Sequence, residues 1–108
     1  MCNLKTWYKS EDGYIQQCAE CNCFQVIFGT TMFAMDESRF RSFADLVLFR
    51  CNSLVSVDED LRYIVLPTAG PATRMLLNER ELRALNDMLQ YVDTELTTAG
   101  LLELFEGR

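Results

Sequence analysis

The stretch FQVIFGTTMFAMDESRFRSF, residues Phe24–Phe43, decides the fold, because it contains two strands, a turn and the start of a helix. Alternating apolar residues on both sides of Gly29 predict a β-hairpin. Asp36 is a typical N-cap, and Glu37 follows it in the first turn, where the helix dipole favours an anion. Apolar residues then recur at helical spacing, at Phe40, Phe43, Leu46 and Val47. Residues 24–51 therefore predict a strand–strand–helix unit.

A second segment, residues 61–93, has the same order. Its strands flank a turn rich in proline and glycine, and Asn78 precedes a run with helical periodicity. Aligning Asp36 with Asn78 also aligns the apolar stripes, with Leu82 on Phe40. The sequence therefore predicts a tandem internal repeat. Whether the repeat reflects duplication stays open, because any two hairpin–helix units share caps and periodicity.

Two further segments complete the chain. Residues 1–23 predict an N-terminal hairpin followed by a cysteine turn. Residues 94–108 predict a separate C-terminal amphipathic helix, weakened by Gly100. We therefore expect a single antiparallel α+β domain over residues 1–108, with about six strands and three helices.

The composition excludes several classes of protein. The 108 residues carry a net charge of −6, with 10 basic and 16 acidic side chains. This balance argues against binding to nucleic acid or to an anionic membrane surface, both of which need clustered Lys and Arg. The sequence shows neither a signal peptide nor an apolar run long enough to span a membrane. We expect a soluble cytoplasmic protein with reduced cysteines.

Catalytic motifs are also missing from the sequence. The chain has no histidine, which removes the commonest general base and the usual catalytic zinc sites. It contains no glycine-rich phosphate loop of known spacing. We therefore expect a protein that is not an enzyme.

The cysteines form the one pattern with chemistry in it. Cys18-x-x-Cys21 can supply two zinc ligands from one turn. If the first hairpin turns at Gly13, residue 2 lies opposite about residue 20, which would bring Cys2 beside the pair. The fourth ligand is left open between Cys23 and Cys51, with Glu20 or water as alternatives. The competing interpretation is a set of reduced structural thiols without zinc.

Trp7 and Tyr8 are candidates for a partner surface. They lie in the first hairpin, where an edge strand with exposed aromatic rings would bind another protein. A domain with several hairpin edges also favours self-association, and we expect a homodimer.

Several motifs in their order resemble a family of small uncharacterised bacterial proteins. They are an early cysteine, Gly13, Cys18-x-x-Cys21, FQVIFG and MDESRFRSF, followed by LRYIVLPTAGPATRMLLNERELRALNDML. The resemblance extends to about Val92 and leaves out the segment from Thr94. It implies the architecture and a three-cysteine pattern of Cys2, Cys18 and Cys21, but no reaction.

The leading interpretation is a non-catalytic module that binds another protein or a second copy of itself. The first alternative is a metal or thiol sensor that uses Cys2, Cys18 and Cys21. The second is a domain that binds a small molecule between its two hairpin–helix units.

Overall fold

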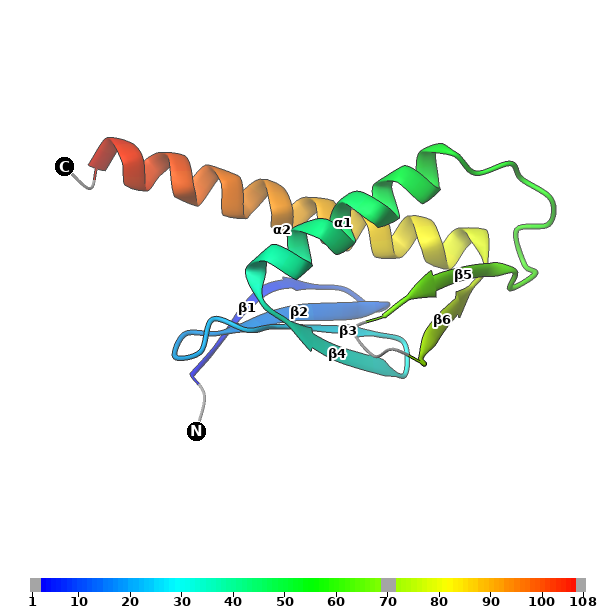
Figure 1. The fold of residues 1–108 in the computed structure, drawn as a ribbon, viewed down its shortest axis with the longest axis horizontal. Coiled ribbons are helices and arrows are strands. Elements are labelled where there is room, and N and C mark those ends of the chain that lie inside the picture. Colours follow the sequence, from blue (N-terminus) through cyan, green and yellow to red (C-terminus); the bar gives the residue numbers. More distant parts are fainter. Residues whose placement is uncertain (1–2, 69–71, 107–108) are drawn as a thin grey trace.

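The computed structural model describes residues 3–68 and 72–106 (Figure 1). Four antiparallel strands form a sheet in chain order, each pairing with its neighbour. They are β1 (Leu4–Lys9), β2 (Gly13–Cys18), β3 (Phe24–Phe28) and β4 (Thr31–Met35). A separate two-stranded sheet joins β5 (Ile64–Pro67) to β6 (Arg74–Leu77). The six strands and the antiparallel α+β class are as predicted.

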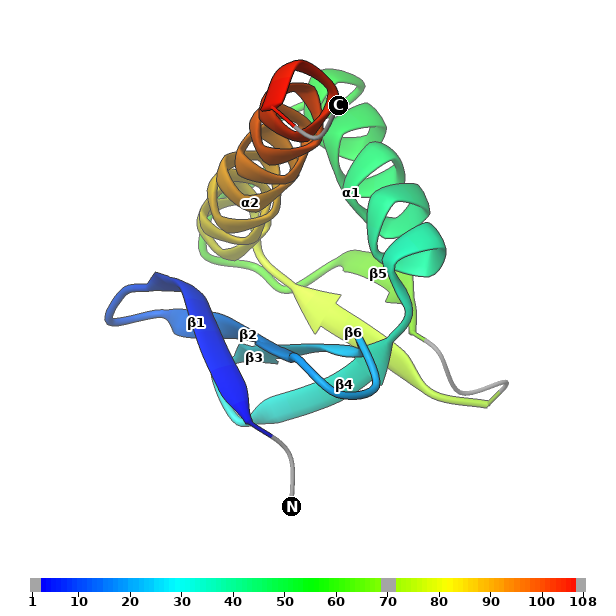
Figure 2. The same cartoon turned by 90° about the vertical axis from the view of Figure 1, so that its left-hand side faces the viewer.

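The described residues contain two helices, α1 (Glu37–Asn52) and α2 (Glu79–Glu106). Both lie on the same face of the four-stranded sheet and pack against each other (Figures 1 and 2). The opposite face of that sheet is not covered by either helix (Figure 2). Neither helix, over the residues described, has the length and apolarity needed to cross a membrane.

Local side-chain hydrogen bonds fix where both helices begin. Asp36 accepts a hydrogen bond from the Arg39 amide at 2.8 Å. Asn78 accepts one from the Glu81 amide at 2.8 Å, while Glu81 accepts one from the Asn78 amide at 2.9 Å. This reciprocal pair is a capping box, which satisfies amides that the first helical turn leaves without partners. The predicted caps are confirmed.

One glycine is required by the close approach of two strands. A Cβ atom on Gly13 would lie 2.0 Å from the Ile27 carbonyl oxygen on β3. No side chain fits at that distance, so β2 can begin beside β3 only at a glycine.

The core lies between the sheets and the helices. Phe24 of β3 stacks on Phe40 of α1 with ring centroids 4.8 Å apart, and both are fully buried. On the second unit, the side chains that fill the core come from β5, from β6 and from one stripe of α2: Ile64, Leu66, Met75, Leu77, Leu82, Leu85, Met88, Leu89 and Val92.

The prediction of a third helix over residues 94–108 is wrong. Helix α2 runs without interruption from Glu79 to Glu106. No proline or capping motif separates Val92 from Thr94, and the Thr97 hydroxyl donates to the Asp93 carbonyl within the continuous helix. Gly100 lowers helix propensity by about 1 kcal/mol relative to Ala, which a long helix tolerates.

The predicted order of elements recurs along the chain. A hairpin precedes each helix, with β3 and β4 before α1 and β5 and β6 before α2. The two hairpins belong to different sheets. The internal repeat therefore remains a prediction about ancestry that the order of elements does not test.

Candidate functional site

The cysteine turn connects β2 to β3. The Cys18 amide donates to the Cys23 carbonyl at 3.0 Å, and the Asn22 amide donates to the Cys18 carbonyl at 2.8 Å. Asn22 has a φ of 59°, in the left-handed region that asparagine tolerates better than most residues. Cys18 is buried, Cys21 is exposed and Cys23 is half-buried. The turn therefore gathers three cysteines at one edge of the molecule.

The thiols of this turn influence one another. A hydrogen bond between the Cys23 and Cys21 side chains raises the pKa of Cys23 above its ordinary value. The charge of Cys21 raises it further, with smaller contributions from burial, Cys18 and Asp36. Two neighbouring thiolates would repel each other, so Cys23 holds its proton more strongly than an isolated thiol does.

The hairpin register brings the N-terminal segment toward this turn. Leu4 pairs with Cys18, and the Ala19 amide donates to the Asn3 carbonyl at 2.9 Å. Cys2 itself lies outside the described residues. Within the described ranges, no group of three or more Cys, Asp and Glu side chains is arranged to hold a metal ion. Zinc therefore stays a prediction.

Cys51 does not join the turn. Its thiol lies beside α2, 3.9 Å from the Leu82 carbonyl, and its pKa is raised mainly by burial. Cys23 instead lies near Asp36, at the opposite end of α1. The fifteen residues from Asp36 to Cys51 span about 22 Å of helix. Thiols at the two ends of such a helix are too far apart to bind the same metal ion. This separation argues against Cys51 as a fourth ligand beside Cys23, and the ligand set stays a prediction.

Trp7 and Tyr8 lie on the edge strand β1, but both are half-buried against the core. The Trp7 indole donates to the Gln17 side chain at 2.9 Å, and the Lys5 ammonium lies 3.8 Å from the Trp7 ring centroid. The Tyr8 ring packs 5.3 Å from the Tyr91 ring of α2. These contacts hold β1 to the domain, and a role of Trp7 and Tyr8 in binding a partner stays a prediction.

Glu79 is a buried carboxylate that was not predicted from the sequence. It accepts hydrogen bonds from the Ser56 hydroxyl at 2.8 Å, the Val57 amide at 3.0 Å and the Tyr63 hydroxyl at 2.9 Å. The bond from Ser56 is the largest cause of a lowered pKa of Glu79, and burial opposes it. Through these hydrogen bonds, Glu79 holds the loop of residues 53–63 against the start of α2.

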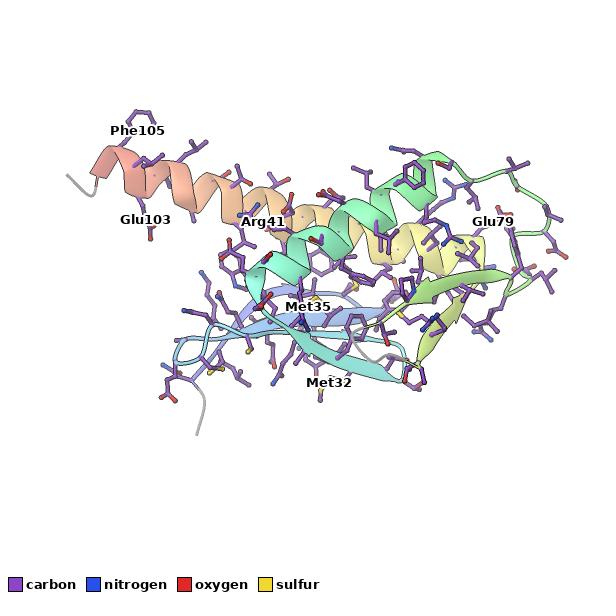
Figure 3. All side chains as sticks on the ribbon, in the orientation of Figure 1. Met32, Met35, Arg41, Glu79, Glu103 and Phe105 are labelled. Atoms are coloured by element: carbon purple, nitrogen blue, oxygen red, sulfur yellow. The ribbon has the colours of Figure 1, made fainter. Side chains whose placement is uncertain are left out.

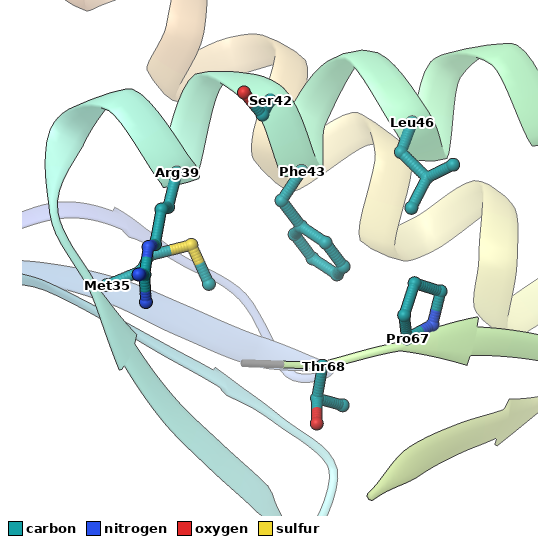
Figure 4. A pocket seen from close by; sticks show the side chains of 7 residues that line it. All are labelled: Met35, Arg39, Ser42, Phe43, Leu46, Pro67 and Thr68. Carbon is teal, nitrogen blue, oxygen red and sulfur yellow. The ribbon is translucent and has the colours of Figure 1, made fainter. Parts of the chain in front are cut away.

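A cleft opens beside α1, between the end of β4 and β5 (Figure 4). Its volume is about 370 Å³. The lining is apolar except for one guanidinium and two hydroxyls: Met35, Arg39, Ser42, Phe43, Leu46, Pro67 and Thr68. The cleft thus lies between the two hairpin–helix units.

The end of α2 forms a second unusual surface. Arg41 of α1 donates to Asp93 at 3.0 Å and to Thr97 at 3.2 Å, and beyond Thr97 the helix extends past α1 and past the sheet (Figure 1). We call residues 98–106 the α2 extension. Its apolar side chains are exposed: Leu101 by 51%, Leu102 by 52%, Leu104 by 64% and Phe105 by 81%.

These apolar side chains do not continue the buried stripe of α2. Nine residues separate Leu101 from buried Val92, and nine separate Phe105 from Leu96, which packs on the core. Nine residues make about two and a half turns, so each pair lies on opposite sides of the helix. Phe105 accordingly points away from the sheet, and Glu103 points toward it (Figure 3).

Comparison with known proteins identifies a family but no activity. The chain matches DUF6686, a family of unknown function, over residues 1–104. The chain belongs to this family. The match continues beyond Val92, where the resemblance in the sequence ended, so the family includes most of the α2 extension. No curated protein and no solved structure matches the chain.

Proposed function

We propose that this DUF6686 protein is a non-catalytic, cytoplasmic interaction module that associates with a second copy of itself through the α2 extension. The observation that carries the proposal is the exposure of Leu101, Leu104 and Phe105 on a helix face that the domain core does not use. Exposed apolar surface of this kind is typical of contact sites between proteins.

The distribution of charge on the extension suits pairing between two copies. From Ala84 to Glu106 the sequence has five carboxylates and no Lys or Arg. Glu103 points to the side opposite Phe105 (Figure 3). Two extensions can therefore pair antiparallel about a two-fold axis, with their apolar faces in contact and Glu103 in water. The remaining repulsion between like charges is long-range and is weakened by salt.

The size of the apolar face limits the affinity. Only four large apolar side chains are available on each copy, whereas a stable interface usually involves about 20–30 residues on each side. We therefore expect a reversible dimer at micromolar concentrations, which tightens as ionic strength rises. A contact based on oppositely charged residues would weaken under the same change.

Sedimentation equilibrium of the full chain, measured at low and high salt, tests the proposal. The expected result is a monomer–dimer equilibrium that approaches twice the chain mass of 12.5 kDa. A mass of one chain at all micromolar concentrations and both salt levels would overturn it. A double variant, Leu101→Ser with Phe105→Ser, is expected to remain monomeric.

A thiol sensor is the second candidate, supported by the contact between Cys21 and Cys23. Because Cys21 is exposed and adjacent to a second thiol, it is accessible to oxidants or to a soft metal ion. Elemental analysis of protein purified without a metal-chelating tag tests the metal form of this candidate. Protein without bound zinc, copper or iron would remove the metal form.

A further inference from the structure

The cleft beside α1 has the features of a ligand site that neither the family nor the interaction module accounts for. Arg39, Ser42, Phe43 and Leu46 follow one another along one side of α1 and form one wall (Figure 4). Pro67 and Thr68, at the end of β5, lie across from them. Its volume of about 370 Å³ falls within the range of about 300–1,000 Å³ that is common for small-molecule sites.

The floor and walls of the cleft favour a hydrocarbon group. Met35 and Phe43 are nearly buried, with 7% and 8% of their surfaces exposed, and they form the inner part of the lining. Leu46 and Pro67 add apolar surface nearer the opening. A chain or ring that covers these four side chains would gain about 25 cal/mol for each Å² of apolar surface removed from water.

The polar groups of the cleft favour a single negative charge. The guanidinium of Arg39 has no hydrogen bond or ion pair with any residue in the described ranges, although its backbone amide bonds to Asp36. Arginine binds a carboxylate through two parallel N–H bonds. Glu37 and Asp36 are the carboxylates nearest to Arg39 in the sequence; Glu37 accepts a hydrogen bond from Arg41, and Asp36 caps the start of α1.

Other ligand classes fit this lining less well. A phosphate or dicarboxylate would need more than the single cation that the lining provides. A cationic ligand would meet Arg39 with no carboxylate in the lining to offset it. A neutral hydrocarbon would leave the guanidinium without a new partner. The geometry points to an apolar monocarboxylate, such as a medium-chain fatty acid or an aryl-alkyl acid, as the ligand of this cleft.

Three eight-carbon probes with different head groups test the inference on the full chain. Octanoate, octan-1-ol and octylammonium are titrated below their micelle concentrations, with binding followed by amide shifts in two-dimensional NMR. We expect saturable shifts for octanoate, centred on Arg39, Ser42 and Leu46. Octan-1-ol should bind with an affinity about tenfold lower than that of octanoate, because it lacks the charge-assisted hydrogen bonds. Octylammonium should not bind in the cleft.

Arg39→Gln provides the matched variant. Since the Arg39 side chain is exposed and has no described partner, the variant should fold normally, which a thermal melt verifies. It should lower octanoate affinity about tenfold, to the level of octan-1-ol. Arg80→Gln removes the same charge from the start of α2, away from the cleft, and should leave octanoate binding unchanged.

Three results would overturn the inference. They are octanoate shifts centred outside the cleft, for example on the α2 extension; equal affinity for octanoate and octan-1-ol; and unchanged octanoate affinity in Arg39→Gln.

Discussion

Phe105→Ser is the substitution that most directly tests association through the α2 extension. It removes the most exposed large side chain of the extension and leaves the net charge of the chain unchanged. Because Phe105 is 81% exposed and outside the core, the monomer should unfold at nearly the same temperature as the wild type.

The expected loss of affinity follows from the exposed fraction. Complete burial of a Phe side chain is worth about 1.5–3 kcal/mol. With 81% of Phe105 exposed in the monomer, about 2 kcal/mol is available to each copy. A symmetric dimer uses the residue twice, which gives about 4 kcal/mol if both rings are fully covered. If each ring is half covered, the loss is about 2 kcal/mol, or roughly a 30-fold weaker dimer.

Sedimentation equilibrium of the wild type and two variants measures this effect. Phe49→Ser is the matched control, since Phe49 is also an exposed phenylalanine, at 65%, but lies near the end of α1. We expect Phe49→Ser to associate like the wild type and Phe105→Ser to associate roughly 30-fold more weakly. Equal dimer affinity in Phe105→Ser and the wild type, or an equal loss in both variants, would refute pairing through the extension.

Two further predictions concern buried or neighbouring titratable groups. Folding lowers the pKa of Glu79 below its ordinary value of 4.5, so its contribution to stability is complete above that pH and is lost as pH falls through the lowered pKa. Near neutral pH, the Glu79→Gln variant should therefore melt at a lower temperature than the wild type. On acidification its melting temperature should fall less than that of the wild type. Melting temperatures that fall in parallel with pH in the two proteins would contradict this prediction. The raised pKa of Cys23 predicts that iodoacetamide modifies Cys21 first, and that Cys21→Ser makes Cys23 react faster, as mass spectrometry of digests can follow. Unchanged Cys23 reactivity in Cys21→Ser would count against the thiol contact.

Elements set by short-range interactions could be predicted from the sequence. The helix starts at Asp36 and Asn78 depend on hydrogen bonds to residues three positions away. The hairpin of β3 and β4 depends on the alternation of apolar residues around Gly29, whose φ is 59°. Such signals lie within a few residues of one another, so the chain displays them before any tertiary contact is known.

Features that depend on distant contacts could not be predicted. The burial of the Glu79 carboxylate was not predicted. Its burial arises because the loop carrying Ser56 folds back over it, and no local pattern predicts that path. The continuity of α2 was missed because no local signal shows that the helix continues past Val92 into Thr94, where Arg41 of α1 binds Asp93 and Thr97.

The candidate site shows the same division. Spacing alone allowed both Cys23 and Cys51 as a fourth ligand, because the sequence does not show how a helix separates them. The residues that line the cleft could not be predicted from the sequence. Arg39 and Pro67, for example, are far apart in the sequence and come together only when the two hairpin–helix units pack. The sequence did predict that a small-molecule site, if present, would lie between those units.

The two proposed surfaces share no residue, and this makes them separable by experiment. The cleft is lined by residues of β4, α1 and the end of β5, whereas the extension consists of residues 98–106 of α2. Phe105→Ser should therefore weaken self-association without changing octanoate affinity. Arg39→Gln should weaken octanoate binding without changing self-association.

A crossed result would change the physical picture. If Arg39→Gln also weakened the dimer, and octanoate dissociated it, then the acidic, apolar extension of one copy would occupy the cleft of the other. The cleft lining, four apolar side chains and one arginine, would in that case be recognising Phe105 and a carboxylate of the partner copy rather than a free acid. Measuring both variants in both assays distinguishes two independent surfaces from one reciprocal contact.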